Sequence, residues 1–99
     1  MTQMLENYEI DDLIGKGRFA EVFRALKKDL GREVALKILL PIWYENPSVR
    51  EQFKVQAKLI AQLKHPRIVE VFDLNDENSR LYMVMEYLHK GDRHQWLQS

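Results

Sequence analysis

The chain has 99 residues, which is enough for one small domain with a single hydrophobic core. Its 15 basic and 15 acidic side chains cancel to a formal net charge of zero, so nothing in the charge balance indicates nucleic acid or an anionic membrane as a partner. The absence of cysteine excludes disulfides and thiolate metal sites, and the 3 histidines lack the spacing of metal ligands, so we expect no metal site. The longest apolar stretch, residues 38–44, is too short to span a membrane and the N-terminus lacks a signal-peptide pattern, so we expect a cytoplasmic protein.

The first predicted element is a strand that leads into a glycine-rich loop. The strand is indicated by apolar residues whose alternation is imperfect, namely Tyr8, Ile10, Leu13 and Ile14. Asp11 and Asp12 interrupt the pattern. Gly15, Gly17 and Ala20 then form a G-x-G-x-x-A loop, and a loop with almost no side chains lets backbone N–H groups approach phosphate oxygens closely.

The next segment, residues 19–30, fits a helix at least as well as a strand. Its apolar residues recur at helical spacing: Phe19, Val22, Phe23, Leu26 and Leu30. A glycine loop that opens a helix is the dinucleotide-binding arrangement, which is therefore one alternative. Against it, the strand before the glycines is too polar to lie in the centre of a parallel sheet, and no acidic residue for a ribose follows the next strand. These two features favour a strand-loop-strand arrangement.

A buried strand is predicted over residues 32–39, after a turn marked by Gly31. Lys37 lies in the middle of this apolar run. Lysine is almost never fully buried unless it is paired, so a lysine in a hydrophobic strand needs an anionic partner. The buried lysine and the glycine loop together indicate a site for a nucleotide triphosphate.

The principal helix is predicted over about residues 48–64. Ser48 and Glu51 have the spacing of a capping box, and His65-Pro66 ends the helix. The residues between them that recur at helical spacing are Val49, Phe53, Gln56, Ala57, Ile60 and Leu63.

Two further strands, residues 68–74 and 81–87, are predicted to form an antiparallel hairpin around a turn at residues 75–79. Strands that cluster while helices segregate are typical of the α+β class. We therefore expect an antiparallel sheet of about five strands with one principal helix packed across it.

In this order and spacing, the motifs resemble the small lobe of eukaryotic-type protein kinases, particularly the bacterial serine/threonine kinases. The resemblance covers nearly the whole chain and rests on the glycine-rich loop, the lysine strand, the helix that ends at His65-Pro66, and a strand with a following hinge at residues 81–88. It implies one kinase-like domain over residues 1–99 that comprises the small lobe only, with the hinge at about residues 86–91.

The resemblance also implies a role for each matching residue. Backbone amides of residues 16–20 cover the phosphates of ATP, Lys37 contacts the α- and β-phosphates, Met85 is the gatekeeper, and Asp92 reaches the ribose. The residues expected to bind ATP are Ile14, Gly15, Lys16, Gly17, Arg18, Phe19, Ala20, Glu21, Val22, Ala35, Lys37, Met85, Glu86, Tyr87, Leu88 and Asp92.

The sequence departs from the family in two places. Gln56 occupies the helix position that usually carries the glutamate partner of the lysine; we expect it to face the core and to position phosphate less well than a carboxylate. The chain also contains no H-R-D-x-x-x-x-N, D-F-G or A-P-E motif, so we expect no phosphoryl transfer by these residues alone and Mg²⁺ binding only with a large lobe. The alternative is a pseudokinase-like module that binds a protein or itself through the interlobe surface, with Trp96 and Leu97 as candidate contacts.

Overall fold

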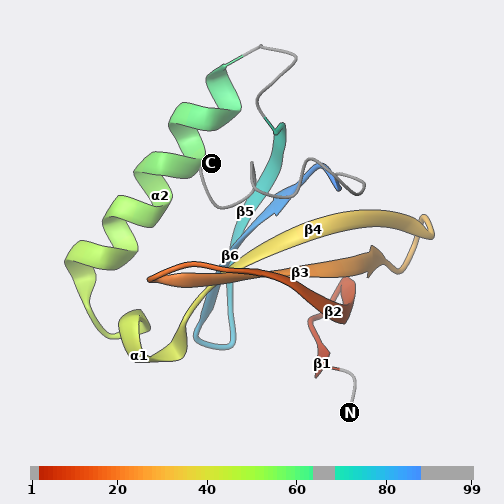
Figure 1. Ribbon diagram of the computed structural model, residues 1–99, viewed down its shortest axis with the longest axis horizontal. Coiled ribbons are helices and arrows are strands. Elements are labelled where there is room, and N and C mark those ends of the chain that lie inside the picture. Colours follow the sequence, from red (N-terminus) through yellow and green to blue (C-terminus); the bar gives the residue numbers. More distant parts are fainter. Residues whose placement is uncertain (1–2, 64–68, 88–99) are drawn as a thin grey trace.

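The computed structural model describes residues 3–63 and 69–87. In chain order the elements are β1 (Gln3–Met4), β2 (Tyr8–Lys16), β3 (Ala20–Lys27), β4 (Arg32–Leu39), α1 (Pro41–Tyr44), α2 (Pro47–Gln62), β5 (Val71–Glu77) and β6 (Arg80–Met85). The strands form one six-stranded antiparallel sheet in the order β1-β2-β3-β4-β6-β5, and α2 lies along one side of it (Figure 1). The predicted α+β class is confirmed, with the two-residue strand β1 added to the expected strands.

The segment after the glycines is a strand. β3 pairs with β2 on one side and with β4 on the other, and its apolar residues are divided between the two faces of the sheet. Ala20 and Val22 pack on the face that also holds residues of α2, whereas Phe23 and Ala25 pack on the opposite face. The helical interpretation of residues 19–30 is therefore wrong, and the antiparallel sheet excludes the dinucleotide-binding alternative with it.

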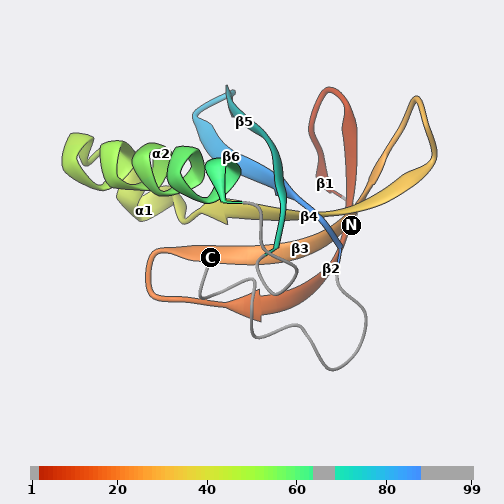
Figure 2. The same cartoon turned by 90° about the horizontal axis from the view of Figure 1, so that it is seen from above.

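Each face of the sheet carries an apolar core. The core on the α2 side consists of Ala20, Val22, Ala35, Leu39, Phe53, Ala57, Val69, Leu81, Met83 and Met85. The core on the other side consists of Leu5, Tyr8, Ile10, Ala25, Val34, Leu36, Ile38, Tyr82 and Val84. Figure 2 shows α1 and α2 side by side along the end of the sheet where β2 and β3 are joined. The β2–β3 loop, which contains the glycines, thus lies near the helices.

The start of α2 differs from the prediction. Asn46, and not Ser48, is the N-cap: its side-chain oxygen accepts hydrogen bonds from the backbone N–H groups of Ser48 at 3.0 Å and Val49 at 3.2 Å. Pro47 occupies the first helical turn, where its missing N–H costs nothing. The predicted capping box at Ser48 is wrong because the preceding Asn-Pro pair already begins the helix. Neither α1 nor α2, the helices of residues 3–63, is long and apolar enough to cross a membrane.

The predicted hairpin is confirmed, but its turn is much tighter than expected. β5 continues to Glu77, and Asn75, Asp76 and Glu77 pair with residues of β6 instead of forming the turn. Only Asn78 and Ser79 connect the strands, with φ angles of 53° and 61°, as in a two-residue turn that matches the twist of a hairpin. The polar residues Asn75, Asp76 and Glu77 are typical of a turn, but they extend β5 because this strand lies at the edge of the sheet.

Candidate functional site

The glycine-rich loop is a closed hairpin tied to the start of α1. The Gly17 N–H donates to the Ala20 carbonyl at 2.8 Å, and the Leu40 N–H donates to the Phe19 carbonyl at 2.8 Å. The Phe19 ring contacts Trp43 of α1 edge to face, with 5.0 Å between the ring centroids. The Arg18 guanidinium lies 5.2 Å from the centroid of the Phe19 ring. The loop tip is therefore held beside the end of β4 that follows the buried lysine.

Lys37 is buried in the middle of the sheet, as predicted. Only 7% of its surface is exposed, and it lies on β4 between Val22 of β3 and Met83 of β6. Burial lowers the pKa of the Lys37 ammonium, because removal from water disfavours the charged form. Ala35 and Leu39, two residues away on either side, belong to the core on the α2 side. The lysine thus brings a cation to the face that α2 covers.

Four of the residues expected to bind ATP gather on the same face. Ala35 pairs with Met85 across β4 and β6, and both have no exposed surface, as has Val22. Ile14 packs against this core from β2. These side chains are contiguous, but in this structure they form core and not the wall of an open cleft.

Two segments complete the predicted site. At the end of β6, Glu86 is exposed and its N–H donates to the Glu70 carbonyl at 2.9 Å, while Tyr87 is half-buried and packs on the core of the α2 side. In the loop hairpin, Lys16 pairs with Glu21 and Gly15 pairs with Val22. The remaining residues singled out from the sequence lie outside the described residues: Leu88, Asp92, His65, Pro66, Trp96 and Leu97.

Gln56 does not face the core. α2 buries Phe53, Ala57 and Ile60, whereas Gln56 is exposed, so the expectation that it lies inside the apolar stripe is wrong. It lines an open, largely apolar groove of about 770 Å³ between α2 and the loop hairpin, together with Phe19 and Leu39. The helix turns Gln56 away because its buried residues already follow the i, i+4, i+7 pattern.

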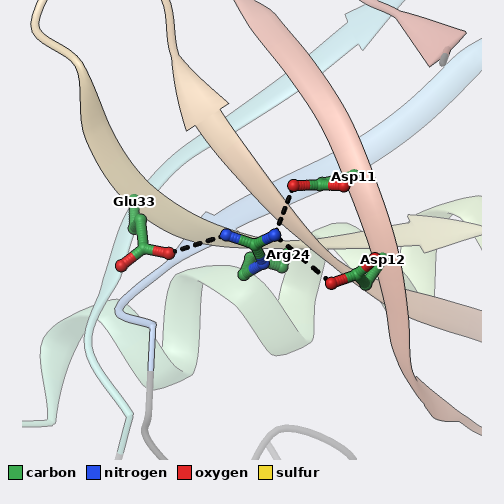
Figure 3. Close-up of polar contacts among 4 residues, drawn as sticks. All are labelled: Asp11, Asp12, Arg24 and Glu33. Carbon is green, nitrogen blue, oxygen red and sulfur yellow. Dashed lines mark hydrogen bonds and ion pairs between the residues drawn. The ribbon is translucent and has the colours of Figure 1, made fainter.

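A charged cluster at the other end of the loop hairpin was not predicted. Arg24 of β3 pairs with Asp11, with Asp12 at 3.3 Å and with Glu33 of β4 at 2.9 Å (Figure 3). The hydrogen bond to Glu33, followed by the charges of Asp11 and Asp12, raises the pKa of Arg24. The signal in the sequence was the pair of consecutive aspartates that interrupts the alternation of the first strand. Trp43 was also missed, since α1 was not predicted.

Comparison with known proteins relates this arrangement to one family. Residues 8–99 match the sequence profile described as Protein kinase domain. The chain is 34% identical over 94 residues to Aurora kinase B of Mus musculus, an alignment that covers 95% of this chain and 27% of that protein. It is 36% identical over 87 residues to the serine/threonine-protein kinase ATG1 of Kluyveromyces lactis, covering 88% of this chain and 10% of that protein. The chain thus spans about a quarter or less of these relatives.

Solved structures share the fold. The structure titled "PpkA-294 apo form" has a TM-score of 0.74 and 24% identity, over 86% of this chain and 37% of that one, which shows the fold alone. The Mycobacterium tuberculosis PknI kinase domain has a TM-score of 0.68 and 26% identity, over 87% of this chain and 35% of that one. The sheet with its single long helix is therefore an arrangement found within larger chains.

Proposed function

Because the chain belongs to the protein kinase domain family and has the fold of its small lobe, we propose that it binds ATP on the sheet face that α2 covers. The observation that carries the proposal is the burial of Lys37. An ammonium on a largely apolar face attracts an anion more strongly than an ammonium in water does, because the surroundings screen the charge less. A polyphosphate beside the glycine loop is such an anion.

Two backbone hydrogen bonds limit which N–H groups of the predicted site are available to the nucleotide. The Gly17 N–H is already donated to Ala20, so the phosphates meet the backbone further along the tip, at Arg18 and Phe19. The Glu86 N–H is likewise engaged with Glu70, so a different hinge residue donates to adenine. Adenine packs against Val22 and Ala35, which requires this buried face to open when the nucleotide binds.

Two features limit what these residues contribute to phosphoryl transfer. Gln56 is neutral and exposed at the groove, so it offers Lys37 no carboxylate, and we expect looser positioning of the phosphates. Among the residues the structure describes, no group of three or more histidine, cysteine, aspartate or glutamate side chains could hold a metal ion. In a longer protein, transfer of the γ-phosphoryl group to a serine or threonine hydroxyl would draw its base and metal ligands from other residues.

The test is a calorimetric titration of the chain with ATP, with and without Mg²⁺, using Lys37→Met as the matched variant. We expect saturable binding by the wild type and a loss of affinity of about tenfold or more in Lys37→Met, because the substitution keeps the length of the side chain and removes the charge. A circular dichroism spectrum and a melting curve for each protein show that both are folded.

Absence of binding at millimolar ATP by a folded wild-type chain would contradict the proposal. It would favour the alternative of an interaction module, for which α2 supplies one observation: Val55 and Leu59 are 44% and 58% exposed beside the groove. Sedimentation of the chain alone, with and without ATP, then shows whether this surface causes self-association.

A further inference from the structure

The strand that leads into the glycine loop contains a bulge. β2 pairs with β3 through Ile10 and Ala25, and the next pair is Leu13 with Phe23. Between these pairs, Asp11 and Asp12 of β2 stand opposite Arg24 alone. An extra residue on one strand leaves the ladder locally disrupted and bends that strand, and such bulges are often found next to functional sites.

Arg24 binds both bulged residues. In a regular strand, consecutive side chains point to opposite faces of the sheet. Here the bulge lets the Asp11 and Asp12 carboxylates reach the same guanidinium, and Figure 3 shows Arg24 between them on one side and Glu33 on the other. Arg24 therefore connects β2, β3 and β4 at the one place where backbone pairing between β2 and β3 is interrupted before Leu13.

The part of β2 after the bulge buries less apolar surface than the part before it, where Tyr8 and Ile10 lie in the core. Beyond Asp12, Leu13 is 44% exposed, Lys16 and Gly17 are exposed, and the pairing shifts again between Leu13 and Gly15. The register of a strand is weakly specified where it has few buried side chains or is rich in glycine, and a slip of one residue turns every side chain to the other face. The polar contact at the bulge is then a local determinant of where the loop begins, at the opposite end of the hairpin from the contacts that tie its tip to α1.

We propose that Arg24 is a positioning residue for the glycine-rich loop: by holding Asp11 and Asp12 it fixes the bulge, and with it the register that places the loop over the face of Lys37. β3 connects the bulge to the lysine: Arg24 and Val22 lie on the same face of this strand, and Val22 pairs with Gly15 on one side and with Lys37 on the other. This inference rests on the proposed ATP function for its consequence, but not for its structural content.

A role in register differs from a role in overall stability. The four side chains are 30–66% exposed, and ion pairs at such positions add little to the free energy of unfolding. Loss of Arg24 should therefore leave the sheet folded and loosen only the segment that it positions.

The experiment compares Arg24→Gln with Lys27→Gln. Lys27 lies on the same strand, is exposed to the same extent (31% against 30%) and is 3.9 Å from Asp29, but it pairs with Tyr8, outside the bulge. In Arg24→Gln without nucleotide, we expect amide hydrogen exchange of residues 13–22 to accelerate about tenfold while exchange in β5 and β6 is unchanged. ATP should bind about three- to fivefold more weakly to Arg24→Gln, whereas Lys27→Gln should match the wild type in both measurements.

Arg24→Lys provides the conservative variant. A lysine retains the charge but lacks the planar fork that binds several carboxylates at once, so it should restore only part of the protection of residues 13–22. Exchange within twofold of wild type across residues 13–22 in Arg24→Gln, or acceleration shared equally by β5 and β6, would overturn the proposal. Faster exchange of residues 13–22 in Arg24→Gln without any change in its affinity for ATP would also overturn the proposal. If the wild type does not bind ATP, the proposed function fails by itself, and the exchange measurement still decides whether Arg24 fixes the register.

Discussion

The two faces of the sheet accommodate polar groups in different ways, although alternate residues of the same strands build both. On the α2 face, Lys37 is the one charged side chain that is buried within residues 3–63 and 69–87, and burial lowers its pKa. On the other face, the hydroxyl of the buried Tyr82 donates to Glu77 at 3.1 Å and accepts from Asn75 at 3.4 Å. One face holds a buried ammonium whose pKa is lowered by burial, and the other holds a neutral hydroxyl that hydrogen-bonds to residues of the adjoining hairpin strand.

This difference separates binding from stability at neighbouring positions. Leu36 and Lys37 are consecutive on β4 and both are buried, yet they face opposite cores. A neutral, well-packed face contributes mainly to folding, because each buried methylene adds to the free energy of unfolding. A buried cation contributes little to folding and is retained where it binds an anion.

The largest expected effect therefore comes from Leu36→Ala. Leu36 has no exposed surface, so the truncation should lower the free energy of unfolding by about 3 kcal/mol. Lys37→Met should change it by less than about 1 kcal/mol, because a straight apolar chain of similar length fills the same space in the core. Urea unfolding followed by circular dichroism measures both, and equal losses in the two variants would show that the faces do not differ in this way.

An intermediate effect is expected at the start of α2, the helix that covers the Lys37 face. Asn46→Ala removes the acceptor for two backbone N–H groups and should cost about 1 kcal/mol. Ser48→Ala is the matched control, since Ser48 lies two residues away and uses only its backbone N–H in the cap; it should stay within about 0.3 kcal/mol of the wild type. A lower melting temperature for Ser48→Ala than for Asn46→Ala would instead identify Ser48 as the N-cap.

The smallest expected effects are the opposite pH dependences of the two faces. The folded-state pKa of Lys37 lies below its ordinary value of 10.5, so between these two pKa values the unfolded chain binds more protons and stability rises with pH. Burial, then the hydrogen bond to Glu77, raises the pKa of Tyr82 above its ordinary value of 10.0, so above pH 10 the unfolded chain loses its proton first and stability falls.

Unfolding curves between pH 7 and 11 check both signs. Lys37→Met should abolish the rise and Tyr82→Phe should reduce the fall. Part of the fall should remain in Tyr82→Phe, because burial also raises the pKa of Tyr8, whose ring contacts that of Tyr82. If the free energy of unfolding of the wild type falls with pH in the range where Lys37 should make it rise, the assignment of the buried charge to the α2 face is contradicted.

The strand with the strongest apolar pattern was predictable to the residue, whereas polar residues obscured the extent of other strands. The strand from Arg32 to Leu39 was predicted with its observed bounds, because its buried run leaves one interpretation. Periodicity alone indicated a helix for β3, because its apolar residues are divided between the cores on both faces of the sheet and so imitate a helical spacing; the polar strand before the glycines favoured the strand that is observed. The polar end of β5 was read as a turn, because its pairing with β6 depends on backbone hydrogen bonds that side-chain type does not reveal.

The sequence by itself determined the class of fold and the two parts that suggest a phosphate site, the glycine loop and Lys37, because glycine spacing and a lysine in an apolar run are local properties. Only the tertiary structure decided that Gln56 points to a groove and that Asn46 caps α2, since both depend on how the helix docks on the sheet. It alone revealed the bulge at Asp11 and Asp12 with Arg24 opposite, because cross-strand register joins residues that are far apart in the chain.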